Sequence, residues 1–139
     1  MASSSGWRLN LGVDVTAAVG QHELVHVMPM AIEHRNPVVE WNGEQIPLVD
    51  IGTVFLQRPP LSAPFVGVVA YPRLEGKGVQ FGAISLLALP ARITVDDEQA
   101  CDLPDQPVGW KEISISCFSL EGSPCPILDT PALFKSRLS

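Results

Sequence analysis

Residues 22–26 read His-Glu-Leu-Val-His and match the H-E-x-x-H motif of zinc-dependent hydrolases. On a helix, histidines four residues apart share one face and ligate zinc, while the glutamate activates the bound water. The chemistry open to these side chains is therefore metal-assisted hydrolysis. A zinc-dependent hydrolase with His22, Glu23 and His26 at its site is the alternative hypothesis for this chain.

The residues around the motif favour a strand over a helix. Pro29 follows it closely, and residues 25–28 carry two β-branched valines. Residues four apart in a strand are separated by about 13 Å and cannot chelate one ion. The extended zinc motif would place its third histidine at Ile32; His34 or Glu33 could serve only if the chain folded back. We therefore predict no metal and no cofactor.

No other pattern in the sequence is typical of a catalytic site, since a G-x-S-x-G segment and a glycine-rich phosphate loop are both missing. Cys101, Cys117 and Cys125 lack the spacing of metal ligands and are expected to be reduced, partly buried thiols. Asp50 and Asp129 each precede a short apolar segment, which predicts helix N-caps rather than a catalytic carboxylate pair. We therefore predict that the chain is not an enzyme.

Composition and charge narrow the class of protein. The chain has 139 residues, 46% of them hydrophobic, and its 13 prolines and 11 glycines favour many short strands. A net charge of −6 disfavours nucleic acid as a partner, because phosphate binding needs a basic stripe. The longest apolar run, residues 83–91, is about half the length that a membrane span needs. We expect a cytoplasmic protein that binds other proteins, with a disordered N-terminus over residues 1–10.

Alternating apolar residues and turn signals predict a mostly β fold with about nine or ten strands and a few short helices. The predicted strands cover residues 12–19, 24–30, 38–41, 46–49, 65–71, 78–84, 93–95, 111–120 and 125–128. Asn42-Gly43 is the strongest hairpin signal, because both residues tolerate positive φ. Short helices are expected from Asp50 to Phe55 and from Asp129 toward Arg137.

Two stretches of the chain repeat one pattern. Residues 42–55 (NGEQIPLVDIGTVF) and 121–134 (EGSPCPILDTPALF) share a Gly, a Pro, an Asp and a closing Phe at identical spacing. Each stretch is typical of a turn, a strand and a capped short helix. The repetition predicts a chain built from two similar halves, each a small barrel.

Residues 38–51 (VVEWNGEQIPLVDI) resemble the central signature of CheW-like chemotaxis adaptor domains, in which a Gly turn joins an apolar strand to an apolar-Pro-apolar-apolar-Asp strand. Residues 65–84 and 115–134 resemble the family's next hairpin and its closing segment. The resemblance implies one domain over residues 11–139, formed by two intertwined five-stranded β-barrels that share a core. It also implies a non-catalytic adaptor that bridges a CheA-type histidine kinase and a chemoreceptor, or binds another CheW-like domain.

The resemblance further implies where partners bind: on the Gly-turn hairpin and on strand edges near the groove between the barrels. The corresponding residues of this chain are Trp41, Asn42, Gly43, Glu44, Val25 and Val27. Asn42 stands where the family has a basic residue, Val27 where many members have a glutamate, and Ser85-Leu86 where they have Val-Asp. These departures indicate a divergent member, from a twitching-motility or another two-component pathway rather than the main chemotaxis system.

Overall fold

The computed structural model describes residues 3–12, 15–32, 38–57, 63–72, 78–105 and 109–134. Ten strands lie within these ranges: β1 (Ser3–Gly12), β2 (Val15–Gly20), β3 (Leu24–Ile32), β4 (Val38–Trp41), β5 (Glu44–Val49), β6 (Ala63–Pro72), β7 (Val79–Leu86), β8 (Ala91–Asp96), β9 (Ser114–Leu120) and β10 (Ser123–Leu128). They are joined by short helices: α1 (Ile51–Phe55), the 3-10 helix η1 (Asp97–Gln99), α2 (Trp110–Ile113) and α3 (Thr130–Phe134). The predicted mostly β fold with a few short helices is confirmed. No helix in the described ranges is both long and apolar enough to cross a bilayer.

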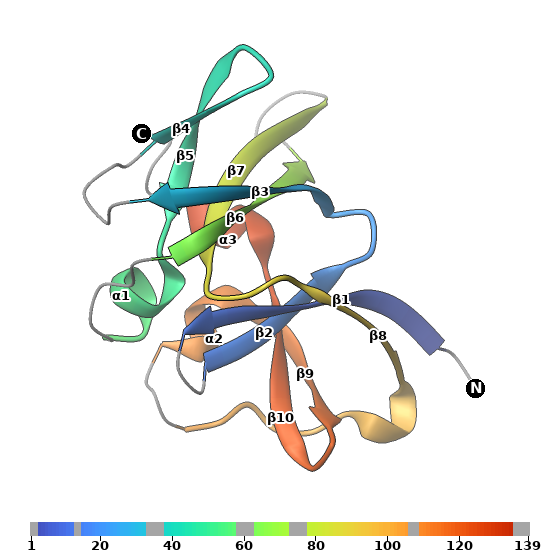
Figure 1. The fold of residues 1–139 in the computed structure, drawn as a ribbon. Coiled ribbons are helices and arrows are strands. Elements are labelled where there is room, and N and C mark those ends of the chain that lie inside the picture. Colours follow the sequence, from blue (N-terminus) through green and yellow to red (C-terminus); the bar gives the residue numbers. More distant parts are fainter. Residues whose placement is uncertain are drawn as a thin grey trace.

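The strands form two five-stranded sheets with the orders β8-β1-β2-β10-β9 and β3-β6-β7-β5-β4, here called sheet 1 and sheet 2. Both follow one plan. A hairpin (β1-β2 or β6-β7) is flanked by an antiparallel strand on one side and by a parallel strand, β10 or β5, on the other. That parallel strand carries its own antiparallel partner, β9 or β4. In Figure 1 the two sheets are curled and lie one above the other, with sheet 2 at the top.

The two halves of the molecule are intertwined. The first two strands belong to sheet 1, the next five form sheet 2, and the last three return to sheet 1. The repeated segments occupy equivalent places, because residues 42–55 form the β4-β5 turn, β5 and α1, while residues 121–134 form the β9-β10 turn, β10 and α3. The prediction of two intertwined five-stranded units is therefore confirmed.

Both repeats begin with a tight turn that requires positive φ at its two central residues. Asn42 and Gly43 have φ of 53° and 82°, and Glu121 and Gly122 have nearly the same values, 52° and 84°. This is the pattern of the type I′ turn, whose twist matches that of the flanking strands. Asparagine adopts positive φ at little cost, whereas glutamate does so less readily, so the second turn carries strain that the first avoids.

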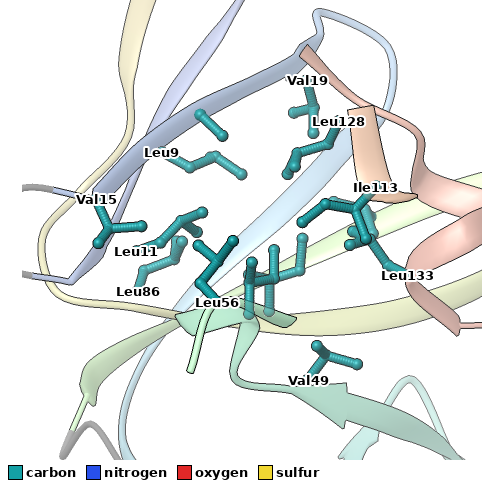
Figure 2. Close-up of a cluster of buried hydrophobic side chains, with 14 of the residues drawn as sticks. Leu9, Leu11, Val15, Val19, Val49, Leu56, Leu86, Ile113, Leu128 and Leu133 are labelled. Atoms are coloured by element: carbon teal, nitrogen blue, oxygen red, sulfur yellow. The ribbon is translucent and has the colours of Figure 1, made fainter. Parts of the chain in front are cut away.

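The main core lies between the sheets and takes side chains from both of them and from all three α-helices. Figure 2 shows part of this cluster, with residues of β1 and β2 facing residues that follow β5 and β10. Its labelled members are Leu9, Leu11, Val15, Val19, Val49, Leu56, Leu86, Ile113, Leu128 and Leu133. A second cluster fills the other face of sheet 2 and includes Val66 and Val68 of β6, whereas Val69 and Tyr71 of that strand belong to the main core.

The N-terminal segment differs from the prediction of disorder over residues 1–10, which is wrong for residues 3–10. Ser3–Gly12 form β1, which pairs with β2 on one side and with β8 on the other. Pairing on both sides satisfies the backbone groups of a serine-rich stretch that has little strand propensity of its own. Gly6 is required at this place, because a Cβ atom there would overlap the carbonyl oxygen of Val19 on the neighbouring strand.

Two further predictions needed correction. The predicted strand 12–19 is divided, since Gly12 ends β1 and β2 begins at Val15. The predicted strand 111–120 begins with the helical turn α2, and only Ser114–Leu120 are extended. Trp110 and Ile113 are buried while Lys111 is exposed, a three-residue spacing that suits one helix face. The predicted hairpin of residues 65–84 is present as β6 and β7, and its turn at residues 75–77 lies outside the described residues.

Candidate protein-interaction site

The H-E-x-x-H segment lies at the connection between the two sheets, where the chain leaves β2 and enters β3. His22 and Glu23 are in the turn, and His26 is within β3, so the motif is not helical. The His22 ring lies against Gln21, 3.1 Å from Nε2 to Nε2, whereas the His26 ring faces Trp41. Across the described residues, no group of three or more His, Cys, Asp or Glu side chains is placed to hold a metal ion. Glu33 and His34 lie outside them.

Glu23 makes two hydrogen bonds that connect separate parts of the chain. Its Oε1 accepts a hydrogen bond from the backbone N–H of Gly20 at 2.8 Å, and its Oε2 accepts one from Thr130 Oγ1 at 2.6 Å. Thr130 begins α3 and is 1% exposed. Because β2 and β10 are parallel neighbours, their carboxyl ends lie side by side, and Glu23 ties together the two connections that leave sheet 1 there.

Asp50 and Asp129 occupy equivalent places before α1 and α3. Asp50 is the N-cap of α1: its Oδ1 accepts from the backbone N–H of Thr53 at 3.4 Å, and its Oδ2 accepts from Thr53 Oγ1 at 3.1 Å. The carbonyl oxygen of Asp129 accepts from the N–H groups of Ala132 and Leu133 at the start of α3. The two carboxylates therefore belong to separate helix starts, one in each repeat.

Trp41 ends β4 and connects three strands of sheet 2. Its ring centroid lies 4.9 Å from that of Phe81 on β7 and 6.5 Å from that of His26 on β3. The indole is half-buried against the second core cluster. Since β3 and β4 are the two edge strands of sheet 2, the contact between Trp41 and His26 brings these edges together.

Val25 projects from edge strand β3 at an irregularity of the sheet. Leu24 is opposite Val69 and His26 is opposite Val68, so Val25 is an extra residue with no partner of its own in the register. Such a β-bulge redirects the side chain at the edge of a sheet. Val25 is 44% exposed, whereas Val27, which pairs with Gly67, is half-buried. Of the two valines predicted to contact a partner, Val25 offers the larger accessible apolar surface.

The β4-β5 turn is exposed and acidic. Asn42, Gly43 and Glu44 are all exposed, and Glu40 on the preceding strand is exposed as well. Gly43 has open space around the position of an added Cβ atom. The hairpin therefore presents a tip without bulky side chains, flanked by two carboxylates.

A shallow hollow of about 280 Å³ lies beside this hairpin, where β5 and β7 diverge. The two strands pair only at Leu48 with Ala83 and at Val49 with Ile84, so their preceding halves are separated. Glu44, Gln45, Ile46, Pro47, Tyr71, Val79, Gln80 and Phe81 line the hollow. Val79 is 52% exposed. The sequence did not identify Val79 and Phe81 as residues of this site. Alternation in residues 78–84 indicated a strand, but it did not indicate that part of this strand would have no neighbouring strand beside it.

The structure places the sequence-predicted contact residues on β3 and on the β4-β5 hairpin of sheet 2. The name interaction edge is used below for Val25, His26 and Val27 of β3 together with Trp41, Asn42, Gly43 and Glu44 of the β4-β5 hairpin. Its two parts come from strands far apart in the sheet order and meet through the ring contact between His26 and Trp41.

A second hollow, of about 440 Å³, lies in sheet 1 beside the β9-β10 turn and is lined by residues that include Arg8, Glu121 and Cys125. Burial raises the pKa of the Cys125 thiol to about 11, although the positive charge of Arg8 lowers it. The thiol is therefore protonated near neutral pH and is a poor nucleophile. This hollow gives no support to a catalytic cysteine.

No protein-family model matches the sequence, and a search of curated proteins gives no match either. Among solved structures, the chain is similar to the scaffolding protein TtCheW from Thermoanaerobacter tengcongensis, with a TM-score of 0.66. The fold is CheW-like. The likeness extends over 96% of this chain and 89% of the other, at 12% sequence identity. The CheW-like fold expected from residues 38–51 is thus confirmed.

Proposed function

We propose that this chain is a non-catalytic adaptor that binds a CheA-type histidine kinase and a chemoreceptor or related signalling partner. The observation that carries the proposal is its likeness, over nearly the full length of both chains, to a protein described as a scaffold. The role of Glu23 as a structural tie supports a binding function over hydrolysis. An adaptor of this kind works in the cytoplasm beside its kinase, in a chemotaxis or twitching-motility pathway.

The interaction edge supplies the apolar part of the proposed contact. Val25 offers an exposed aliphatic side chain on an edge strand, and in the described residues β3 pairs through its backbone with β6 alone. An edge strand exposes backbone N–H and C=O groups that a partner's strand can bind. A partner side chain entering the hollow between β5 and β7 would contact Val79 and Phe81. Binding then uses apolar burial together with backbone hydrogen bonds.

Charge gives the proposed partner a definite chemistry. Glu40 and Glu44 flank the turn, and Asn42 supplies no positive charge. The whole chain carries a net charge of −6. We therefore propose that the surface docking on this hairpin is basic, so that opposite charges steer the encounter. Binding should weaken as salt is raised, because exposed charges are screened over about 8 Å at physiological ionic strength.

The test is a titration of the purified chain against the regulatory domain of a CheA-type kinase, followed by calorimetry. Val25→Glu places a charge in the apolar part of the interaction edge and should weaken binding at least tenfold. Val54→Glu is the matched control, because Val54 lies on α1 and is 42% exposed, close to the 44% of Val25. Equal affinities for the two variants would reject the interaction edge, and no binding by the wild-type chain at high micromolar concentration would reject the adaptor role.

A further inference from the structure

The segment that follows edge strand β8 contacts β9, the other edge strand of sheet 1, and this contact is here called the seam. The chain that follows β8 turns through η1 and returns to β9. There Ala100 forms an isolated antiparallel bridge with Phe118. The Nε2 of Gln99 donates to the carbonyl oxygen of Ser119 at 3.0 Å. The seam is short, and few backbone hydrogen bonds hold it.

Two thiols lie directly opposite each other at this seam. In the register set by Ala100 and Phe118, Cys101 faces Cys117, and the N–H of Cys101 donates to the carbonyl oxygen of Cys117 at 2.9 Å. Their sulfur atoms are 3.4 Å apart. Residues facing each other in an antiparallel pair have Cα atoms about 4.5–5.5 Å apart, which is within the range that a disulfide spans.

We propose that Cys101 and Cys117 form a reversible disulfide that closes the seam of sheet 1 covalently. The bond needs a movement of little more than 1 Å by the two sulfur atoms, since a disulfide is about 2.0 Å long. All three cysteines are reduced in this structure. The pair stands apart from the interaction edge on sheet 2, so the inference does not rest on the proposed function.

The surroundings of the two thiols determine the order of reaction. Cys101 is partly exposed, whereas Cys117 is 3% exposed. Burial, followed by the neighbouring Cys101 thiol, raises the pKa of Cys117 to about 12. Cys101 is therefore the sulfur that meets an oxidant from solvent, and Cys117 is the resolving thiol. A thiol outside this pair, Cys125, is 2% exposed and is the natural control.

The oxidant is a low-molecular-weight disulfide such as oxidised glutathione. The Cys101 thiolate attacks one of its sulfur atoms, forms a mixed disulfide and releases one thiolate. Cys117 then gives its proton to water and attacks the Cys101 sulfur, which breaks the mixed disulfide and releases the second thiolate. Two protein thiols are oxidised and one small disulfide is reduced to two thiols. When the Cys101 sulfur is in the mixed disulfide its charge no longer raises the pKa of Cys117, which favours the second step.

The bond should stabilise the folded chain, because it closes a loop of roughly fifteen residues that the unfolded chain would otherwise leave free. For a chain of this length the expected rise of the thermal midpoint is about 5–10 °C. The rise should be reversed by a reducing agent. Cys125→Ser should retain it, and Cys101→Ser should lose it.

The test uses the full chain at low micromolar concentration, incubated with oxidised glutathione, quenched by alkylation and mapped by mass spectrometry. We expect a monomer that has lost two hydrogen atoms, a disulfide-linked peptide pair containing Cys101 and Cys117, and one alkylated thiol at Cys125. Three alkylated thiols, a lasting glutathione adduct on Cys101, a bond to Cys125 or a covalent dimer would each overturn the proposal. Because mapping is done on the wild-type chain, the result does not depend on whether a variant folds.

Discussion

Replacement of Glu23 by alanine separates the structural account of the H-E-x-x-H segment from the catalytic one. The carboxylate accepts hydrogen bonds from Gly20 N–H and Thr130 Oγ1, at 2.8 and 2.6 Å. Glu23→Ala removes both and leaves the buried hydroxyl of Thr130 without this acceptor. We therefore expect a loss of stability, whereas a glutamate that only activates a zinc-bound water could be replaced with little effect on folding.

The size of the stability loss in Glu23→Ala follows from the burial of the two donors. A hydrogen bond to a charged group contributes about 1.5–3 kcal/mol, and an orphaned buried hydroxyl costs about 1–3 kcal/mol. Glu23 is half-exposed, which places its bonds at the lower end of these ranges. We expect Glu23→Ala to lower the free energy of unfolding by about 2–4 kcal/mol. For a chain of this length, each kcal/mol lowers the thermal midpoint by about 3 °C.

A double-mutant cycle measures the contact between Glu23 and Thr130. Thr130→Val keeps the shape of the buried side chain and removes only its donor, so the double variant should be more stable than the sum of the single changes by about 1 kcal/mol. Urea unfolding followed by circular dichroism gives all four free energies. Strict additivity, or a Glu23→Ala variant as stable as the wild type, would refute the reasoning. Stoichiometric zinc that is lost in His26→Ala would restore the hydrolase hypothesis.

Three further predictions concern other parts of the fold. Gly82→Ala should destabilise the chain by about 1–3 kcal/mol, because the added Cβ would overlap the ring of Phe134. That ring is fully buried and is stacked on Tyr71. Phe134→Leu should partly relieve the destabilisation in the same unfolding assay. Glu121→Asn should stabilise the chain by about 0.5–1 kcal/mol, because asparagine tolerates the positive φ of this turn. The reverse change in the first turn, Asn42→Glu, should destabilise the chain. Thermal midpoints equal to that of the wild type in both variants would count against turn strain. Burial raises the pKa of Cys125 to about 11, so the unfolded chain ionises this thiol first. The contribution of Cys125 to stability should be constant below about pH 8 and fall between about pH 9 and 11, by up to roughly 3 kcal/mol, alongside a fall caused by Cys117, whose pKa is raised to about 12. Unfolding with reductant present should show a shallower fall in Cys125→Ala, and parallel curves would contradict the assignment.

Local patterns in the sequence were sufficient to predict the strands and turns of the two repeats. Both turns need residues that accept positive φ, and both following strands contain a proline and end at an aspartate, which are short-range signals. The intertwined arrangement was expected from the family resemblance. The parallel pairings of β5 with β7 and of β10 with β2 join distant strands, and no local signal specifies them.

The N-terminal strand shows where propensity fails. Ser3, Ser4 and Ser5 have weak preference for a strand, yet they pair with Asp96, Val95 and Thr94 of β8. Pairing with the backbone of neighbouring strands determines the extended conformation of this segment. The alternation of Leu9 and Leu11 further along the chain was the sequence signal that could have predicted the strand. Propensity describes a segment alone, whereas pairing depends on its neighbours.

The candidate site shows a similar division. Exposure of the Asn42-Gly43 turn could be predicted, because such turns lie at the ends of hairpins. The clustering of Trp41 with Phe81 and His26 could not, since it joins three strands through tertiary packing. The partner of Glu23 was hidden for the same reason, because Thr130 is 107 residues away in the sequence.

Hydrogen–deuterium exchange of the chain, free and saturated with the regulatory domain of a CheA-type kinase, tests whether the partner binds at the interaction edge. We expect slower exchange on binding in β3 around Val25 and in the β4-β5 hairpin at residues 41–44, with little change in β9 and β10. Protection confined to sheet 1, or a complex that leaves β3 and the hairpin as exposed as in the free chain, would contradict binding at the interaction edge.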